Sequence, residues 1–374
     1  WKSTYNIDDN HIKLSLGTAS KAQQLVKNTL HRCNIGTDSP YYPKFDKKTI
    51  FVDNKDIKYN DLLRIPFKED LLKDKNISII RISKKRNDYR MNIVYDDEIP
   101  DIDDEKNNRF ASIDLGVVNL CAIVTNIDTP RPIIINGQNI IRINQKYSEK
   151  IDKAKSNTKL YHNVYTSKYI SNLWKRREDK LTHIFNNISA FIITYCKEHK
   201  IDKLIIEYNT NWKNNIKNMS KKGKKEFMNI SYRTLIRQLF YKGKEHGIII
   251  IENEESYTSK CDALILEDFE SCKNDCMNEN GNNKRAKRGL YISSAGYLIN
   301  ADINGAINIM RKHVYKTNQF TNELDEYIQN NPKNFLNPVK FVIGNHKNTL
   351  SKLTLGGKWG TSRLSTRDAS NTQI

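Results

Sequence analysis

The sequence of 374 residues is poor in cysteine, has no long apolar run and has too few acidic side chains to balance its basic ones. Its six cysteines are too sparse for a disulfide framework, so we expect reduced thiols and an intracellular protein. That would mean the cytoplasm of a bacterium, or the nucleus or viral factory if the source is a eukaryote or a large virus. No apolar run reaches the roughly 18 residues of a membrane span, and residues 1–20 lack the pattern of a secretory signal. We therefore expect no membrane partner.

The charge balance is strongly basic. Lys and Arg number 62 against 43 Asp and Glu, which gives a formal net charge of +19. This excess predicts a polyanionic partner and is not needed by an enzyme of neutral metabolites. The hydrophobic share of 38% is slightly low for a globular protein but well above that of a disordered one, so the chain is expected to fold.

The first part of the chain consists of short extended segments separated by polar turns, which predicts a small all-β module. The last two segments are joined by the short, charged KKRND and are expected to form a hairpin. An acidic stretch at 96–108 follows and is expected to be a linker. The predicted strands are HIKLSL (11–16), TIFV (49–52), ISIIRIS (77–83) and RMNIVY (90–95).

From Phe110 onward the pattern is that of an α/β protein. FASIDLG, LCAIVTN and RPIIING are apolar, β-branched runs typical of buried strands, and KLIIE (203–207) and IIII (248–251) are two more. Helices are expected at about 143–198 and at 232–247. In the first of these, apolar residues recur at three- and four-residue steps and mark one buried stripe. The stripe comprises Leu181, Ile184, Ile188, Phe191 and Tyr195. This order predicts an open, largely parallel sheet covered by helices.

Three acidic residues lie where predicted strands end or a predicted helix begins. Asp114 ends FASID, Glu207 ends KLIIE, and Asp302 lies where NADINGAINIM turns from extended to helical. A carboxylate at the end of a buried strand is costly unless it meets a cation or stays in water. The three can converge, because strand ends of a parallel sheet open onto one crevice. The alternative is an ordinary turn after the first strand and a solvated strand end at Glu207.

Converging carboxylates would make a site of hard oxygen ligands, which suits Mg²⁺ or Mn²⁺. Two such ions about 4 Å apart can activate water and stabilise the leaving oxygen of a phosphodiester. If the three converge, Asp114, Glu207 and Asp302 would be the catalytic residues and metal ligands of a phosphodiesterase, and the residues alone leave this and the ordinary alternative open.

Four ordered segments resemble the transposon-encoded TnpB (OrfB) family, whose members are similar to the type V CRISPR effector nucleases. The RuvC-like, RNase H-type core of that family carries an Asp, a Glu and an Asp on three separated motifs, which here fall on Asp114, Glu207 and Asp302. The segments are ASIDLGVVNLCAIVTN (111–126), KLIIEYNTNWKNNI (203–216), ESYTSKCDAL (255–264) and NADINGAINIMRK (300–312).

The resemblance implies an α/β, RNase H-like core in two parts, interrupted by an insert and preceded by a β-rich, wedge-like module. The family generally has a longer part before the first acidic motif, so the start and the helical insert of the wedge are expected to be truncated or absent. The expected parts are the wedge-like module (1–108), the first part of the core (109–256), a degenerate zinc-ribbon-like insert (257–299), the last part of the core (300–330) and a flexible tail (331–374).

The zinc ribbon of the family is expected to have lost its ligands. Aligned on Thr258 and Ser259, the first two cysteine positions of the family fall on Asp262 and Ile265. Aligned on Gly296, six residues before Asp302, the second two fall on Ile292 and Ala295. Cys261, Cys272 and Cys276 lie nearby, but their spacing has no second tight pair and no clear fourth ligand. They are the only candidates for a remnant Zn²⁺ site, and three free thiols in a loop are the favoured interpretation.

Basic clusters flank the acidic motifs and are candidates for phosphate contacts. A solvated charged surface is the ordinary alternative. The candidate residues are Arg176, Arg177, Lys221, Lys222, Lys224, Lys225, Lys284, Arg285, Lys287 and Arg288.

The resulting hypothesis is an RNA-guided, Mg²⁺-dependent DNA endonuclease of the TnpB type, associated with a transposable element. DNA is the expected target, and the guide RNA is implied by the resemblance alone. A catalytically inactive, nucleic-acid-binding derivative of the family is the first alternative. The second is an actin-like or sugar-kinase ATPase, a superfamily with a related core, but the sequence shows no second phosphate loop or Gly-Gly adenosine motif.

Overall fold

The computed structural model describes most of the chain after residue 107 and mainly isolated strands before it. The described residues are 5–8, 11–14, 24, 27–28, 44–45, 49–52, 55–58, 64–66, 76–85, 88–96, 108–128, 130–208, 221–253, 258–273, 289–318, 320–343 and 350–352. The chain divides into two compact units, one of residues 1–82 and 91–97 and the other of residues 83–90 and 98–374.

A seven-stranded mixed sheet is the centre of the second unit, with the strand order β13-β12-β9-β10-β11-β16-β17. β10 is antiparallel to both β9 and β11, whereas β12 is parallel to both β9 and β13. β16 is parallel to β11 and antiparallel to β17. The strands are β9 (Phe110–Leu115), β10 (Asn119–Thr125), β11 (Ile133–Asn136), β12 (Lys203–Glu207), β13 (Ile249–Asn253), β16 (Val339–Ile343) and β17 (Leu350–Lys352).

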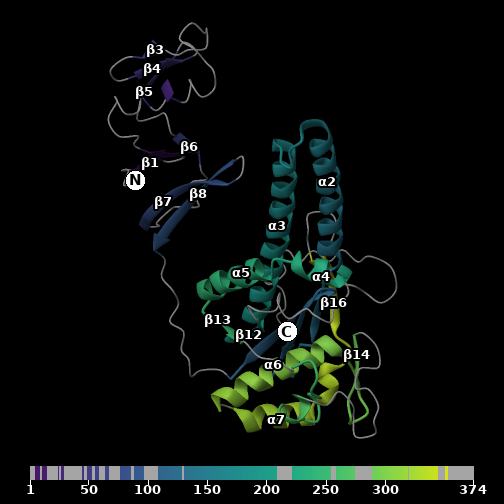
Figure 1. The fold of residues 1–374 in the computed structure, drawn as a ribbon. Helices are drawn as coiled ribbons and strands as arrows, with labels where there is room; N and C mark the ends of the chain where they lie inside the picture. Colours follow the sequence, from purple (N-terminus) through teal and green to yellow (C-terminus); the bar gives the residue numbers. More distant parts are fainter. Residues whose placement is uncertain are drawn as a thin grey trace. The chain divides into compact units, whose positions relative to one another are not determined.

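Helices cover both faces of this sheet (Figure 1). One apolar core lies between the sheet and α2, α3 and α5, and a second lies between the sheet and α6 and α7. A short helix, α4, and the 3₁₀ helices η3 and η4 complete the unit. The bounds are α2 (Gln138–His162), α3 (Lys168–Glu198), α4 (Lys221–Met228), α5 (Tyr232–Glu245), α6 (Ala301–Thr317), α7 (Thr321–Asn330), η3 (Ser271–Lys273) and η4 (Pro332–Phe335).

The expectation of an α/β fold is confirmed, and several elements match their predicted bounds closely. β12 coincides with KLIIE, and α5 ends two residues before Gly247, whose φ of 67° only glycine adopts readily. The predicted helical region is two helices, because Asn163 in the left-handed conformation ends α2 and the side chain of Ser167 caps the start of α3. The predicted stripe of α3 is buried except at Phe191, which is partly buried.

The expectation of a largely parallel sheet is wrong, because β9, β10 and β11 form an antiparallel meander. Only residues 116–118 join β9 to β10 and only 126–132 join β10 to β11. A parallel connection needs roughly a dozen residues or more, so these links permit only antiparallel pairing. The short links, more than the apolar runs, determine the strand directions.

The segment 331–374, which was expected to be a flexible tail, contains regular structure within its described residues 331–343 and 350–352. Val339–Ile343 forms β16, and the backbone N–H of Val339 donates to the carbonyl of Pro132. This short run is a strand because it extends the sheet edge at β11. The polar composition of residues 331–374 as a whole gave no indication that β16 pairs with β11.

The described strands that precede residue 97 form small antiparallel or paired sheets, in agreement with a β-rich N-terminal part. β7 (Asn76–Lys85) and β8 (Asp88–Asp96) pair as the predicted hairpin. The other strands are β1 (Tyr5–Asp8), β2 (His11–Leu14), β3 (Lys44–Phe45), β4 (Thr49–Val52), β5 (Lys55–Lys58) and β6 (Arg64–Pro66). The predicted linker at 96–108 lies almost wholly outside the described residues.

A further small sheet consists of β14 (Leu290–Ile292) and β15 (Leu298–Asn300), which leads directly into α6. Among the helices of the described residues, none has the length and apolar character needed to cross a membrane.

Candidate active site

Two of the three acidic residues end neighbouring parallel strands. β12 pairs with β9 in the register that joins Ile206 to Ile113, so Glu207 and Asp114 are the next residues of their strands. Side chains alternate along a strand, so Asp114 shares the face of Ser112, whose hydroxyl donates to the carbonyl of Ala306 in α6 at 2.6 Å. Both carboxylates therefore belong to the face of the sheet that α6 covers.

Asp302 lies in the first turn of α6, on that same face. The side chain of Asn300 caps the helix by accepting from the backbone N–H groups of Asp302 and Ile303. One turn later, Gly305 packs against Asp114, and a Cβ atom on residue 305 would lie 2.7 Å from Asp114 Oδ2. The missing side chain at Gly305 thus leaves room for the carboxylate of Asp114 beside the helix.

Glu207 and Asp302 each accept a short hydrogen bond from a neighbouring polar side chain. Thr258 Oγ1 donates to Glu207 Oε2 at 2.7 Å, and this pair is buried. Asn119 Nδ2, at the start of β10, donates to Asp302 Oδ2 at 2.6 Å. These donors fix the orientation of the two carboxylates.

A buried polar ladder joins α6 to the segment that carries Thr258. Asn308 Nδ2 donates to the carbonyls of Thr258 and Cys261, at 2.9 and 2.8 Å. Asn304 Nδ2 also donates to the Cys261 carbonyl, and its Oδ1 accepts from the Ala263 N–H. Because buried polar groups are costly unless paired, this ladder fixes the segment against the helix. The elements that carry Glu207's donor and Asp302 are therefore mechanically connected.

The three carboxylates offer only hard oxygen ligands, so their chemistry fits Mg²⁺ or Mn²⁺. Asp114 and Glu207 come from adjacent strands and Asp302 from the helix packed on them. Within the part of the chain that the structure describes, however, no three His, Cys, Asp or Glu side chains are grouped closely enough to hold a metal ion.

A buried, hydrogen-bonded carboxylate occupies the first position at which the family resemblance implies a zinc ligand. Asp262, which is fully buried, accepts from Ser293 Oγ at 3.0 Å, from Ser294 N at 2.7 Å and from Leu264 N at 3.1 Å. These bonds join the segment after Thr258 to the turn between β14 and β15. The other family ligand positions are occupied by Ile265, Ile292 and Ala295, so the residues do not fit Zn²⁺ there.

The cysteines give no further support to a zinc site. Cys261 and Cys272 are buried and form no disulfide, and Cys276 lies outside the described residues. Burial raises the pKa of both described thiols, and the neighbouring Glu267 contributes to the rise. This environment favours the protonated thiol in the metal-free protein.

The basic residues predicted to contact nucleic acid have different surroundings. Arg177 is held within the protein, because Nε donates to Asn144 Oδ1 and Nη2 to the carbonyl of Asn229, both at 2.9 Å. Burial lowers its pKa. Arg176 and Lys225 are exposed and Lys224 is half-buried. Lys221 and Lys222 begin α4, and nothing further is described of their side chains. Lys284, Arg285, Lys287 and Arg288 lie outside the described residues.

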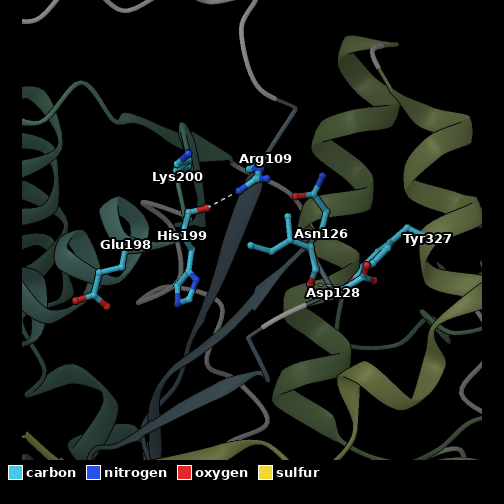
Figure 2. A pocket seen from close by; sticks show the side chains of 8 residues that line it. Arg109, Asn126, Asp128, Glu198, His199, Lys200 and Tyr327 are labelled. Carbon is cyan, nitrogen blue, oxygen red and sulfur yellow. Dashed lines mark hydrogen bonds between the residues drawn. The ribbon is translucent and has the colours of Figure 1, made fainter. Parts of the chain in front are cut away.

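A pocket of about 490 Å³ lies at the opposite end of β9 from Asp114 (Figure 2). Arg109, at its edge, donates to the carbonyl of His199 at 3.1 Å. The lining includes basic Arg109 and Lys200 and acidic Asp128 and Glu198, so the pocket has no strong charge of either sign. It is separate from the three carboxylates.

Sequence reasoning missed the side chains that hold the carboxylates. Thr258 lies in the segment ESYTSKCDAL, which resembles the TnpB family. Nothing in the sequence, however, predicts that its hydroxyl contacts Glu207. Asn304, Asn308 and Arg311 lie on successive turns of α6, and all three are fully buried. That spacing on an otherwise apolar helix is a signal of a buried polar ladder.

Parts of the chain match two family models and one curated protein. Residues 92–213 match the OrfB_IS605 family model, described as a probable transposase, and residues 232–309 match the Cas12f1-like, TNB domain model. The TnpB-like protein ORF457 of Acidianus two-tailed virus is 25% identical over 222 residues, which cover 56% of this chain and 43% of that protein. The chain therefore spans less than half of the length of this relative.

Two solved structures resemble the fold at low identity. A Cas12f1–sgRNA–target DNA complex matches with a TM-score of 0.46 and 19% identity, over 63% of this chain and 46% of that one. A CRISPR-Cas12f ternary complex matches with a TM-score of 0.39 and 14% identity, over 73% of this chain and 61% of that one.

The two family models together match the region that contains the mixed α/β sheet and α6, so this part of the chain is similar to transposase-associated proteins. The resemblance to the TnpB (OrfB) family and to the type V effectors, which was inferred from the sequence, is confirmed by these matches.

Proposed function

We propose that the protein is an Mg²⁺-dependent DNA endonuclease of the TnpB type that is guided by RNA. The observation that carries the proposal is the arrangement of Asp114, Glu207 and Asp302 on the sheet face under α6. The resemblance to the TnpB family and the net charge of +19 support nucleic acid as the partner.

The proposed roles follow from the contacts of each carboxylate. Asp114, Glu207 and Asp302 would hold the metal ions, which when bound supply an activated water and stabilise the leaving oxygen. Thr258 and Asn119 orient two of these carboxylates, and Gly305 makes room for the third. The exposed basic residues would hold the phosphate backbone in a salt-sensitive manner.

A cleavage assay with matched carboxylate variants tests the proposal. We expect Mg²⁺-dependent cleavage of DNA by the protein purified with its bound RNA, and its loss in D114N and D302N. D128N is the control, because Asp128 is an exposed carboxylate of the pocket at the other end of β9. Equal cleavage by D114N and wild type, or loss in D128N alone, would contradict the assignment of the site.

The guide is tested separately, by sequencing the nucleic acid that stays bound after a wash at moderate salt. A single abundant RNA species supports guidance, whereas a random collection of fragments would show only charge-driven binding. Removal of that RNA by nuclease before the assay should abolish site-specific cleavage.

A nucleic-acid-binding derivative without cleavage activity is the second candidate. Two observations favour it. Glu207 and Asp302 already accept hydrogen bonds from protein side chains, and no three possible metal ligands among the described residues lie close enough to hold an ion. Binding without cleavage at any Mg²⁺ or Mn²⁺ concentration, by wild type and D114N alike, would select it.

A further inference from the structure

The helices α2 and α3 form an arm that is joined to the sheet at one end only. They run side by side, and their connected ends lie away from the sheet (Figure 1). A small core of Ile151, Ala154, Ile170 and Leu173 packs the two helices together along the arm. Beyond this core the chain turns through residues 156–169, which we call the tip.

The tip exposes aromatic rings that contribute to no core. Tyr161 is 74% exposed, Tyr165 58% and Tyr169 61%. They lie in the last turn of α2, in the connecting loop and in the first turn of α3, respectively. Leu160 and Val164 are exposed beside them. Such a group of exposed large side chains is unusual on a soluble surface and marks an interaction site.

The charge around the tip has one sign. From residue 153 to residue 177 the sequence contains seven Lys or Arg and no Asp or Glu. Lys159 already lies over the ring of Tyr165, with Nζ 5.4 Å from the ring centroid. Basic side chains interleaved with exposed aromatic rings are the combination with which proteins bind single strands, because the rings stack on bases and the cations neutralise phosphates.

The backbone of the tip has a defined shape. Asn163 adopts the left-handed conformation, and its N–H donates to the carbonyl of Lys159. The hydroxyl of Ser167 accepts from the N–H of Ile170. These two caps hold the loop between the helices, so the rings are presented from a preorganised turn, which lowers the entropic cost of binding.

We propose that the tip binds single-stranded nucleic acid, with bases stacked on Tyr161, Tyr165 and Tyr169 and phosphates close to Lys153, Lys159 and Lys168. The absence of acidic side chains from 153 to 177 favours a polyanion over a protein partner of mixed charge. The inference shares its class of partner with the proposed function, but it does not depend on the carboxylates.

Equilibrium binding of labelled 20-nucleotide single strands, of DNA and of RNA, tests the inference in the presence of EDTA so that no cleavage occurs. Y161A/Y165A/Y169A should bind at least tenfold more weakly, since stacking contributes about 1–3 kcal/mol per base. Y161F/Y165F/Y169F keeps the rings and should bind as wild type does. K153Q/K159Q/K168Q should reduce the magnitude of the slope of log K against log salt concentration by up to about two, because each phosphate contact to a single strand contributes about 0.7.

Y241A is the matched control, because Tyr241 in α5 is 75% exposed and lies outside the tip. It should leave binding unchanged. All of these positions are exposed, so thermal unfolding of each variant should match wild type and show that the fold is intact.

Equal affinity of wild type and Y161A/Y165A/Y169A for both strands, or no binding by wild type, would overturn the inference. So would a change from dimer to monomer in sedimentation with unchanged nucleic-acid affinity, which would make the tip a contact between copies of this chain. Failure of the nuclease proposal has a different signature, namely no cleavage in Mg²⁺ with the tip variant still impaired in binding.

Discussion

Gly305 of α6 lies against the carboxylate of Asp114 in β9, and a Cβ atom at residue 305 would lie 2.7 Å from Asp114 Oδ2. Glycine in a helix interior costs about 1 kcal/mol relative to alanine. The helix therefore loses intrinsic stability at this position, and the space gained is occupied by a candidate catalytic group.

The variant G305A is expected to lose cleavage activity while remaining folded. The added methyl group forces Asp114 into another orientation, and misplacement of a catalytic group by about 1 Å can cost on the order of 100-fold in rate. The gain in helix propensity offsets part of the strain, so the thermal midpoint should change little. Activity and unfolding are measured on the same preparation. Full activity in G305A would mean that the position of Asp114 does not matter for the reaction.

Thr258 is expected to be a positioning residue for Glu207. T258V keeps the shape of the side chain but removes the hydroxyl that donates to Glu207 Oε2 at 2.7 Å. Loss of a donor behind a metal-binding carboxylate typically lowers metal affinity or activity by about 10–100-fold. The Mg²⁺ concentration for half-maximal cleavage should therefore rise in T258V and return to the wild-type value in T258S. A merely structural role for Thr258 would change stability without moving the Mg²⁺ dependence.

The fold and the candidate site were predictable to different extents from the sequence. KLIIE predicts β12, because a short apolar run between polar segments is typical of a buried strand. The carboxylate of Glu207 at its end is visible in the same pattern. The directions of β9, β10 and β11 are determined by the short links on either side of β10. The strand β16 forms because it pairs with β11, which its own sequence does not indicate. The donors to the carboxylates come from residues 51 and 183 positions away along the chain, so only the fold shows them.

Asp262 is expected to stabilise the insert without a metal. In D262N an amide N–H₂ replaces one carboxylate oxygen, and in either orientation it faces a backbone N–H that Asp262 satisfies in the native protein. A buried donor left without an acceptor costs about 1–3 kcal/mol. D268N is the control, because Asp268 also accepts from backbone N–H groups but is exposed to water. Urea unfolding should show a much smaller effect there.

The metal content of the wild-type protein tests the same feature independently. We expect substoichiometric zinc after purification, and a thermal midpoint that EDTA leaves unchanged. One equivalent of zinc together with chelator-sensitive unfolding would contradict the role of Asp262, and would direct attention to Cys261, Cys272 and Cys276.

The buried thiol of Cys196 is expected to make stability fall at alkaline pH. Burial raises its pKa from 9.0 to about 12 in the folded protein. Above pH 9 the unfolded chain loses this proton while the folded chain keeps it, so the unfolded state is favoured by about 1.4 kcal/mol per pH unit for this group until about pH 12. C196A removes the thiol and should reduce the slope of unfolding free energy against pH by about one proton between pH 9.5 and 11. Because alanine also leaves a small cavity, the comparison concerns the slope and not the absolute stability. An unchanged slope would mean that the thiol ionises equally in both states, and hence that the core between α3 and the sheet admits water.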